Sequence, residues 1–246
     1  MKSQIKQIVT VILSVFLLSC SADETNSETS GDPIVSIPKI PLASKIKYLA
    51  LGDSYTIGQS VCETCRYPEQ LNASLKAIYP ETSFTLNIIA KTGWTTSNLI
   101  SAVNEQNPQS NYDLVTLLIG VNNQYQGRDF SIYEKEFPEL VTKAITLAKG
   151  DKKNVIVLSI PDYAYTPFGT MFGGTTKISN EISQYNTFAE NYCKANGVLF
   201  ISITDITQRG IQNPDLVAPD GLHPSKEAYT LFVDRILPKV KVVLQD

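Results

Sequence analysis

The chain is poor in the histidines and cysteines that hold zinc, and it lacks the runs of basic residues that bind nucleic acids. Its 246 residues include one histidine, His223, and four cysteines. A structural zinc site needs about four Cys or His ligands, which the pair Cys62 and Cys65 and a lone histidine do not supply. Lys and Arg number 21 against 24 Asp and Glu, without a basic run, and this argues against a nucleic-acid partner. The sequence therefore predicts no metal and no other cofactor.

Long apolar runs are also scarce, and the one at the N-terminus is short. Lys2 and Lys6 precede an apolar run at 8–18, which ends just before Cys20. This pattern is typical of a secretory signal peptide rather than of a spanning helix. Its end resembles a bacterial lipoprotein signal, in which the cysteine becomes the lipid-bearing N-terminus. We therefore predict a signal peptide over residues 1–19 and an exported protein, facing the periplasm or cell surface and anchored to the membrane at Cys20.

Residues 20–45 are rich in Ser, Thr, Asp, Glu and Pro and poor in apolar residues. A segment of this composition does not build a core. We therefore predict a flexible tether over 20–45 and one domain over 46–246. The sequence does not predict the oligomeric state.

Three cysteines fall in the predicted domain: Cys62, Cys65 and Cys193. An exported protein is able to form disulfides, and an odd number of cysteines leaves one thiol over. A disulfide in the loop at 62–65 is favoured, although the pairing among the three stays open at this point.

Five apolar runs of strand length recur along the domain and predict a parallel sheet. They are Tyr48–Leu51, Phe84–Ala90, Leu114–Ile119, Val155–Ile160 and Val198–Ile203. Several are almost wholly apolar, as expected for strands covered on both faces. Helical periodicity appears between or after them, at 71–78, 137–148, 178–192 and 225–236. The alternation predicts a three-layer α/β/α doubly wound sheet with the flavodoxin-like order 2-1-3-4-5.

Polar motifs follow four of these strands, and in a parallel sheet the carboxyl ends of the strands meet at one edge. The motifs are Gly52-Asp53-Ser54 after the first strand, Gly93 after the second, Gly120-Val121-Asn122 after the third and Asp220-Gly221-Leu222-His223 after the fifth. With the predicted strand order, Gly93 and Asn122 flank Ser54. We therefore expect a single site at this edge of the sheet.

These residue types suit the hydrolysis of an ester. A serine needs a base to become a nucleophile, and His223 is the only imidazole available to Ser54. Asp220 is the predicted carboxylate that orients the imidazole, with Asp205 and Asp215 as less favoured alternatives. The predicted oxyanion-hole donors are the backbone N–H groups of Ser54 and Gly93 and the side-chain amide of Asn122.

The four motifs resemble the sequence blocks of the SGNH hydrolases, also called GDSL esterases and lipases, over roughly residues 46–240. The resemblance implies the three-layer fold and hydrolysis of carboxylic esters through an acyl-enzyme without a metal. It implies the roles given above for Ser54, His223, Asp220, Gly93 and Asn122. The chain departs from the family pattern at Tyr55, where leucine often stands, and at Asn123, where an aspartate is common. The second departure weakens any role for a charge at that position.

The substrate stays open between two classes. Short acyl (acetyl) esters of carbohydrates fit, and so do fatty acyl esters such as lysophospholipids. The same acyl-enzyme also permits acyl transfer to another alcohol. The alternative from another class of function is a lipoprotein that binds a ligand without catalysis on a hydrolase scaffold.

An insertion at 161–177 contains several aromatic residues and glycines: Tyr163, Tyr165, Phe168, Phe172, Gly169, Gly173 and Gly174. It is either ordinary loop packing or a lid or wall of an acyl pocket, with the glycines as hinges. Trp94 is expected to pack in the core, and a role in the substrate pocket is the less favoured alternative.

Overall fold

The computed structural model describes residues 42–171 and 175–245. The predicted signal peptide at 1–19, residues 20–41 of the predicted tether and the predicted anchor at Cys20 lie outside the described residues. The first strand begins at Lys45, one residue ahead of the predicted domain boundary. In the two described ranges, no helix is both long and apolar enough to cross a bilayer.

A parallel sheet of five strands forms the centre of the domain. The strands are β1 (Lys45–Gly52), β2 (Ser83–Ala90), β3 (Leu114–Leu118), β4 (Val155–Leu158) and β5 (Leu199–Ile201). Their order is β2-β1-β3-β4-β5 with every pair parallel, which confirms the predicted order. Every residue of β3 and β4 is buried, because both faces of the central strands are covered.

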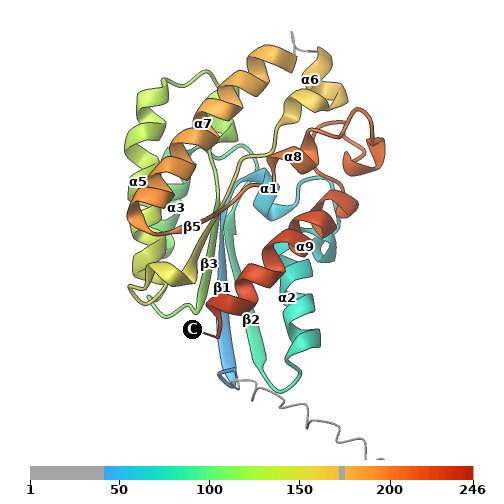
Figure 1. Cartoon of the computed structure of the whole chain (residues 1–246). Coiled ribbons are helices and arrows are strands. Elements are labelled where there is room, and N and C mark those ends of the chain that lie inside the picture. Colours follow the sequence, from blue (N-terminus) through green and yellow to red (C-terminus); the bar gives the residue numbers. More distant parts are fainter. Residues whose placement is uncertain (1–41, 172–174, 246) are drawn as a thin grey trace, which may run out of the picture. The chain divides into compact units, whose positions relative to one another are not determined.

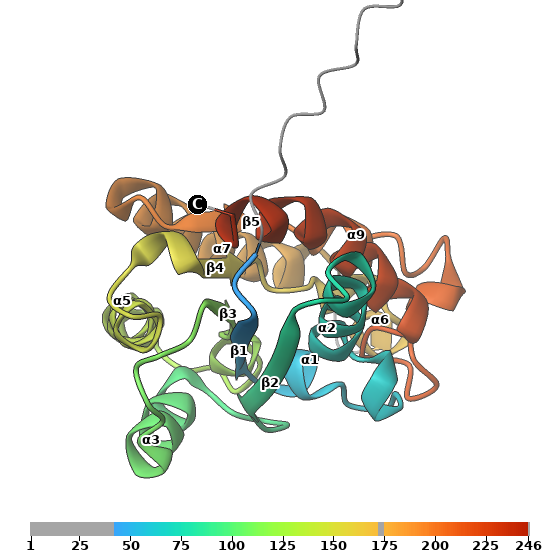
Figure 2. The same cartoon turned by 90° about the horizontal axis from the view of Figure 1, so that it is seen from below.

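Two layers of helices cover the sheet (Figures 1 and 2). On one face, α2 (Tyr67–Ile78) packs against α9 (Lys226–Val243). On the other face lie α3 (Thr96–Gln106), α5 (Phe130–Leu147) and α7 (Thr175–Asn196). This arrangement confirms the predicted three-layer α/β/α architecture.

Short helical segments complete the connections. They are α1 (Ser54–Ile57), α4 (Val121–Tyr125), α6 (Pro167–Met171) and α8 (Thr204–Thr207), with 3₁₀ turns η1 (Glu63–Cys65), η2 (Lys152–Asn154), η3 (Tyr163–Tyr165) and η4 (Pro214–Leu216). Two of them, α1 and α4, begin within three residues of the ends of β1 and β3. They determine how the polar motifs leave the sheet.

The sequence patterns did not predict α3. This helix buries few side chains, among them Leu99 and Val103, so its apolar period is weak. It begins instead with a capping box: Thr95 Oγ1 accepts from the N–H of Asn98, and Asn98 Oδ1 accepts from the N–H of Thr95. The residue three positions after the cap is usually Glu or Gln in this box. Here it is Asn98, so the sequence does not show the usual helix-start pattern.

The strand register brings the ends of β1, β2 and β3 to one level. Gly52, the last residue of β1, is paired with Ala90 of β2 and with Leu118 of β3. A Cβ at Gly52 would lie 2.1 Å from Oγ1 of Thr56 and 2.4 Å from the carbonyl oxygen of Leu118, so only glycine fits where β1 turns into α1. The motifs after these three strands therefore start side by side.

Candidate active site

A cavity of about 270 Å³ opens at this edge of the sheet. Its lining includes four of the five predicted site residues: Ser54, Gly93, Asn122 and His223. The remainder is mainly apolar and aromatic and includes Tyr55, Val121, Tyr125, Tyr163, Phe168 and Leu222. The fold thus brings segments far apart in the sequence to one concave surface.

Ser54 is the first residue of α1 and directly follows Asp53, the N-cap of that helix. Oδ1 of Asp53 accepts a hydrogen bond from the backbone N–H of Tyr55 at 3.0 Å. The N–H groups of the first helical turn have no acceptor within their own helix. The N–H of Ser54 is one of these, and Ser54 lines the cavity.

Gly93 lies in the turn after β2 with a φ of +83°, in the left-handed region that favours glycine. A Cβ here would meet no atom within 4 Å, so the backbone conformation, and not lack of space, requires glycine. That conformation sets the direction of the Gly93 peptide group beside the cavity.

His223 and Asp220 form the hydrogen bond that a catalytic triad needs. Nδ1 of His223 lies 2.6 Å from Oδ2 of Asp220. Oδ1 of Asp220 accepts from the backbone N–H groups of Leu222 and His223, both at 3.0 Å. Nε2 of His223 is therefore the ring nitrogen left to take a proton. No hydrogen bond joins it to Ser54 Oγ in the described part of the chain, and such catalytic contacts often tighten only with substrate.

The alternative carboxylates are engaged elsewhere or lie apart from the imidazole. Asp205 forms an ion pair with Arg235, and the hydrogen bond from that guanidinium lowers the pKa of Asp205. Asp215 lies in η4 and is exposed. The structure therefore pairs His223 with Asp220, as the sequence favoured.

Burial acts to raise the pKa of Asp220, but hydrogen bonds outweigh it. Donors from Ser60, from the His223 ring and from the backbone N–H groups of His223 and Leu222 lower that pKa to about 2. Asp220 is consequently ionised throughout the neutral range. The permanently charged Asp220 carboxylate beside Nδ1 of His223 favours the tautomer in which Nδ1 carries the proton and Nε2 is the acceptor.

Asn122 and Gln126 hold the loop that follows β2. Nδ2 of Asn122 donates to the carbonyl oxygen of Trp94 at 3.0 Å, and Nε2 of Gln126 donates to that of Gly93 at 3.1 Å. The second amide hydrogen of Asn122 has no acceptor among the described residues, so it is available in the cavity. The ring of Trp94 packs against the core and does not line the cavity, which agrees with the core role expected for it.

Asn123 has a structural role that needs no charge. It is fully buried; its Oδ1 accepts from the N–H of Thr96 at 3.0 Å, and its Nδ2 donates to Thr96 Oγ1 at 2.7 Å. The amide thus ties α4 to the start of α3 with one acceptor and one donor. The departure from the family pattern at this position leaves the cavity lining intact.

The insertion at 161–177 forms part of the cavity wall. Tyr163 and Phe168 line the cavity, and both rings contact Tyr125, with centroids 6.2 and 6.1 Å away. Gly169 is packed tightly, since a Cβ there would lie 2.0 Å from the carbonyl oxygen of Tyr163. Close packing therefore requires glycine at this position, and its expected role as a hinge stays a prediction. The other expected elements, Phe172, Gly173 and Gly174, lie outside the described residues.

Three residues in or beside the cavity were missed by the sequence analysis: Asp53, Ser60 and Tyr125. Asp53 is named in the sequence analysis only as part of the Gly52-Asp53-Ser54 motif and receives no role there, although it directly precedes the predicted nucleophile. It is fully buried, and burial, partly offset by backbone hydrogen bonds, raises its pKa from 3.8 to about 7. Below neutral pH its carboxyl is therefore largely protonated.

We expect Asp53→Asn to stabilise the protein at pH 8 and to leave it unchanged near pH 4. The native state holds the Asp53 proton more tightly than the unfolded chain between about pH 4 and pH 7, so the wild-type free energy of unfolding falls as pH rises through this window. Asparagine does not ionise, and the gain at pH 8 should be on the order of a few kcal/mol. Thermal unfolding at both pH values measures it.

Asp129 provides the matched control, because it also caps a helix. Its carboxylate is exposed, and hydrogen bonds from Ser131 lower its pKa. Asp129→Asn should therefore bring no gain at high pH. A stability difference for Asp53→Asn that does not vary with pH would contradict the buried ionisation.

A serine that follows the first strand and an aspartate-bonded imidazole line one cavity on a three-layer parallel sheet, and these features are typical of a serine hydrolase. The chain belongs to the GDSL-like lipase/acylhydrolase family, whose model matches residues 50–231. It is accordingly a carboxylic ester hydrolase by family. No curated protein matches the chain at a significant level.

Solved structures share the fold at low sequence identity. A member of the lipolytic protein G-D-S-L family from Veillonella parvula is 18% identical, with a TM-score of 0.60 over 78% of this chain and 97% of that one. The psychrotrophic esterase EstA from Pseudoalteromonas sp., in a structure inhibited by monoethylphosphonate, is 17% identical with a TM-score of 0.57 over 81% and 99%. Axe2, an acetylxylan esterase from Geobacillus stearothermophilus, is 19% identical with a TM-score of 0.55 over 82% and 96%.

Proposed function

We propose that the protein hydrolyses carboxylic esters with the triad Ser54, His223 and Asp220. Nε2 of His223 takes the proton of Ser54 Oγ as that oxygen attacks the ester carbonyl carbon. The tetrahedral intermediate collapses to an acyl-enzyme, and the imidazolium gives its proton to the departing alcohol. Water then attacks the acyl-enzyme with the same base, which releases the acid and restores the serine.

The oxyanion of each tetrahedral intermediate needs donors placed before the reaction. We assign this role to the N–H groups of Ser54 and Gly93 and to the amide of Asn122, because all three residues line the cavity. The hydrogen bond from Asn122 to the Trp94 carbonyl orients the amide in advance. Preorganised donors require little rearrangement as charge develops.

The observation that carries this proposal is the 2.6 Å hydrogen bond between Asp220 and the only imidazole, in a residue that shares a cavity with Ser54. A fluorophosphonate probe tests it directly. The activated serine should form a covalent adduct, and peptide mass spectrometry should locate it at Ser54. Probe binding without an adduct would instead support the non-catalytic binding protein.

We further propose short acyl esters, such as acetyl groups on carbohydrates, as the substrate class. The cavity of about 270 Å³ is smaller than the roughly 300–1,000 Å³ typical of sites for drug-sized ligands. The ring of Tyr125 contacts those of Tyr163 and Phe168, and the three rings form an aromatic wall of the cavity. A fold shared with an acetylxylan esterase supports the same substrate class.

We expect p-nitrophenyl acetate and butyrate to be hydrolysed best, with kcat/KM falling roughly 100-fold by palmitate, because a long chain meets the aromatic wall. Phe168→Ala removes part of this wall and should move the optimum to octanoate. Met171→Ala is the matched control, since Met171 also lies in α6 but is 73% exposed and does not line the cavity. A wild-type optimum at palmitate would favour fatty acyl esters.

We also propose, from the sequence pattern alone, that the protein is exported and anchored to the membrane. The charged and apolar segments before Cys20 support export and a lipid anchor on that cysteine. Metabolic labelling with a fatty acid analogue, lost in Cys20→Ala, tests the anchor.

A further inference from the structure

The loop between α1 and α2 contacts the triad at a residue that the sequence analysis did not identify. Ser60 has a φ of +68°, in the left-handed region that few residues other than glycine adopt. Its Oγ donates a 2.6 Å hydrogen bond to Oδ2 of Asp220, which is 160 residues further along the chain. This oxygen is the one that also accepts from Nδ1 of His223. The loop that leaves the nucleophile thus reaches back to the residue that orients the base.

Four hydrogen bonds converge on the Asp220 carboxylate. Oδ1 accepts hydrogen bonds from the backbone N–H groups of Leu222 and His223, and Oδ2 accepts hydrogen bonds from Ser60 Oγ and His223 Nδ1. A carboxylate has about four acceptor positions, so all of them are used and the plane of the group is fixed. Ser60 is the only one of these donors that lies outside the 220–223 turn, within the described part of the chain.

A disulfide between Cys62 and Cys65 closes the turn that follows Ser60. This confirms the favoured loop disulfide and leaves Cys193 as a free, buried thiol, whose pKa burial raises to about 12. The covalent closure lies only two residues beyond Ser60. It therefore restricts the backbone that presents the Ser60 hydroxyl.

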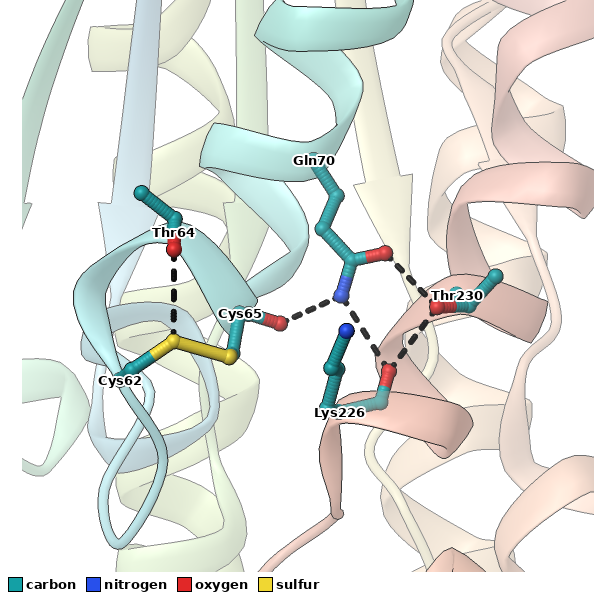
Figure 3. Close-up of a disulfide and its surroundings, with 6 residues drawn as sticks. All are labelled: Cys62, Thr64, Cys65, Gln70, Lys226 and Thr230. Atoms are coloured by element: carbon teal, nitrogen blue, oxygen red, sulfur yellow. Dashed lines mark hydrogen bonds between the residues drawn. A yellow bond between two sulfur atoms is a disulfide. The ribbon is translucent and has the colours of Figure 1, made fainter.

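The disulfide-closed turn is also fastened to the start of α9 (Figure 3). Nε2 of Gln70 donates to the carbonyl oxygen of Cys65 at 2.5 Å and to that of Lys226 at 3.2 Å. Oε1 of Gln70 accepts from Thr230 Oγ1 at 2.8 Å. Lys226 begins α9 three residues after His223. The loop is thus bonded to the 220–226 segment on both sides of the imidazole.

We propose that Ser60 is a positioning residue of the triad and that the Cys62–Cys65 disulfide holds it against Asp220, so that ester hydrolysis depends on this bond. The inference rests on the triad proposed above. A dithiol reagent reduces the bond by transferring two electrons and two protons, which leaves two protein thiols and a cyclic disulfide on the reagent. Without the closure, the unfavourable left-handed conformation of Ser60 can relax away from Asp220.

Ser60→Gly tests the hydroxyl, because glycine keeps the left-handed backbone without strain. In the full-length chain we expect kcat to fall about tenfold, the effect of one hydrogen bond to a charged group, with KM unchanged. The chain has one histidine, so the downfield resonance of its Nδ1 proton is unambiguous in the NMR spectrum and should shift. Thr64→Ala removes an exposed hydroxyl from the same turn, which lies 3.3 Å from Sγ of Cys62 (Figure 3). It leaves the disulfide closed and the Ser60 hydroxyl in place, so it should move neither kcat nor this resonance.

The disulfide is tested in combination with Ser60. Dithiothreitol treatment of the wild type and the Cys62→Ser/Cys65→Ser variant should each lower kcat about as much as Ser60→Gly. Adding Ser60→Gly to the cysteine variant should cost nothing more, because both changes act on one contact. The reagent should not affect the cysteine variant, because Cys193, the cysteine that remains among the described residues, is a free thiol and offers no disulfide to reduce.

The outcomes separate this inference from the proposed function. Full kcat and an unshifted proton resonance in Ser60→Gly would overturn the role of Ser60, and additive losses would overturn its link to the disulfide. Both results leave the triad standing if the wild type still forms the fluorophosphonate adduct at Ser54. A wild type that forms no adduct would remove the triad and this inference together.

Discussion

Ser54→Ala and His223→Ala should each lower kcat by roughly 10⁵–10⁶, and the double variant should lose no more than either single one. The reason is that nucleophile and base perform one step. An unassisted serine is scarcely nucleophilic at neutral pH, and without the serine the imidazole has no nucleophile of the protein to deprotonate. Steady-state hydrolysis of p-nitrophenyl acetate by the three variants measures this non-additivity.

The fold should survive these substitutions, so the loss is attributable to chemistry. Ser54 and His223 line the cavity, and far-UV circular dichroism should match the wild type. Ser101→Ala is the matched serine control, because its hydroxyl only donates to the carbonyl oxygen of Ser97 on the surface of α3. If the double variant lost far more activity than the single ones, Ser54 and His223 would act independently and the triad would be wrong.

The sheet was predictable because its signals are local. Each strand is a short apolar run between polar segments, and two-sided burial removes the alternation that marks half-exposed strands. Parallel pairing then places every carboxyl end at one edge. The register confirms this, since Gly52 lies level with Ala90 and Leu118. The shared position of Ser54, Gly93 and Asn122 follows from chain order and topology.

The residues that the sequence analysis missed depend on contacts between distant segments. Ser60 has no local pattern: its hydroxyl gains a partner only when the loop after α1 meets Asp220. Tyr125 lines the cavity together with Tyr163 and Phe168, whose rings contact it from a later segment of the chain. The raised pKa of Asp53 comes from burial, and the motif Gly52-Asp53-Ser54 does not reveal from its sequence that this carboxyl is buried. Tertiary packing, rather than periodicity, creates each of these features.

The second large effect should come from Asn122→Ala, which we expect to lower kcat by roughly 10²–10³ with a much smaller change in KM. The amide of Asn122 is neutral and does not titrate, so it donates to an oxyanion at any pH at which the base works. Its bond to the Trp94 carbonyl fixes the direction of the second hydrogen. Because the charge on the substrate oxygen develops after binding, the loss should fall on kcat.

Gln126→Ala separates this role from that of holding the loop after β2. Gln126 is exposed, does not line the cavity and donates to the carbonyl oxygen of Gly93 at 3.1 Å. It thus supports the same loop as Asn122 without reaching the substrate. Gln126→Ala should therefore change kcat only a few-fold. Equal losses in the two variants would mean that Asn122 acts by holding the loop; a large loss in Asn122→Ala alone places its amide at the oxyanion.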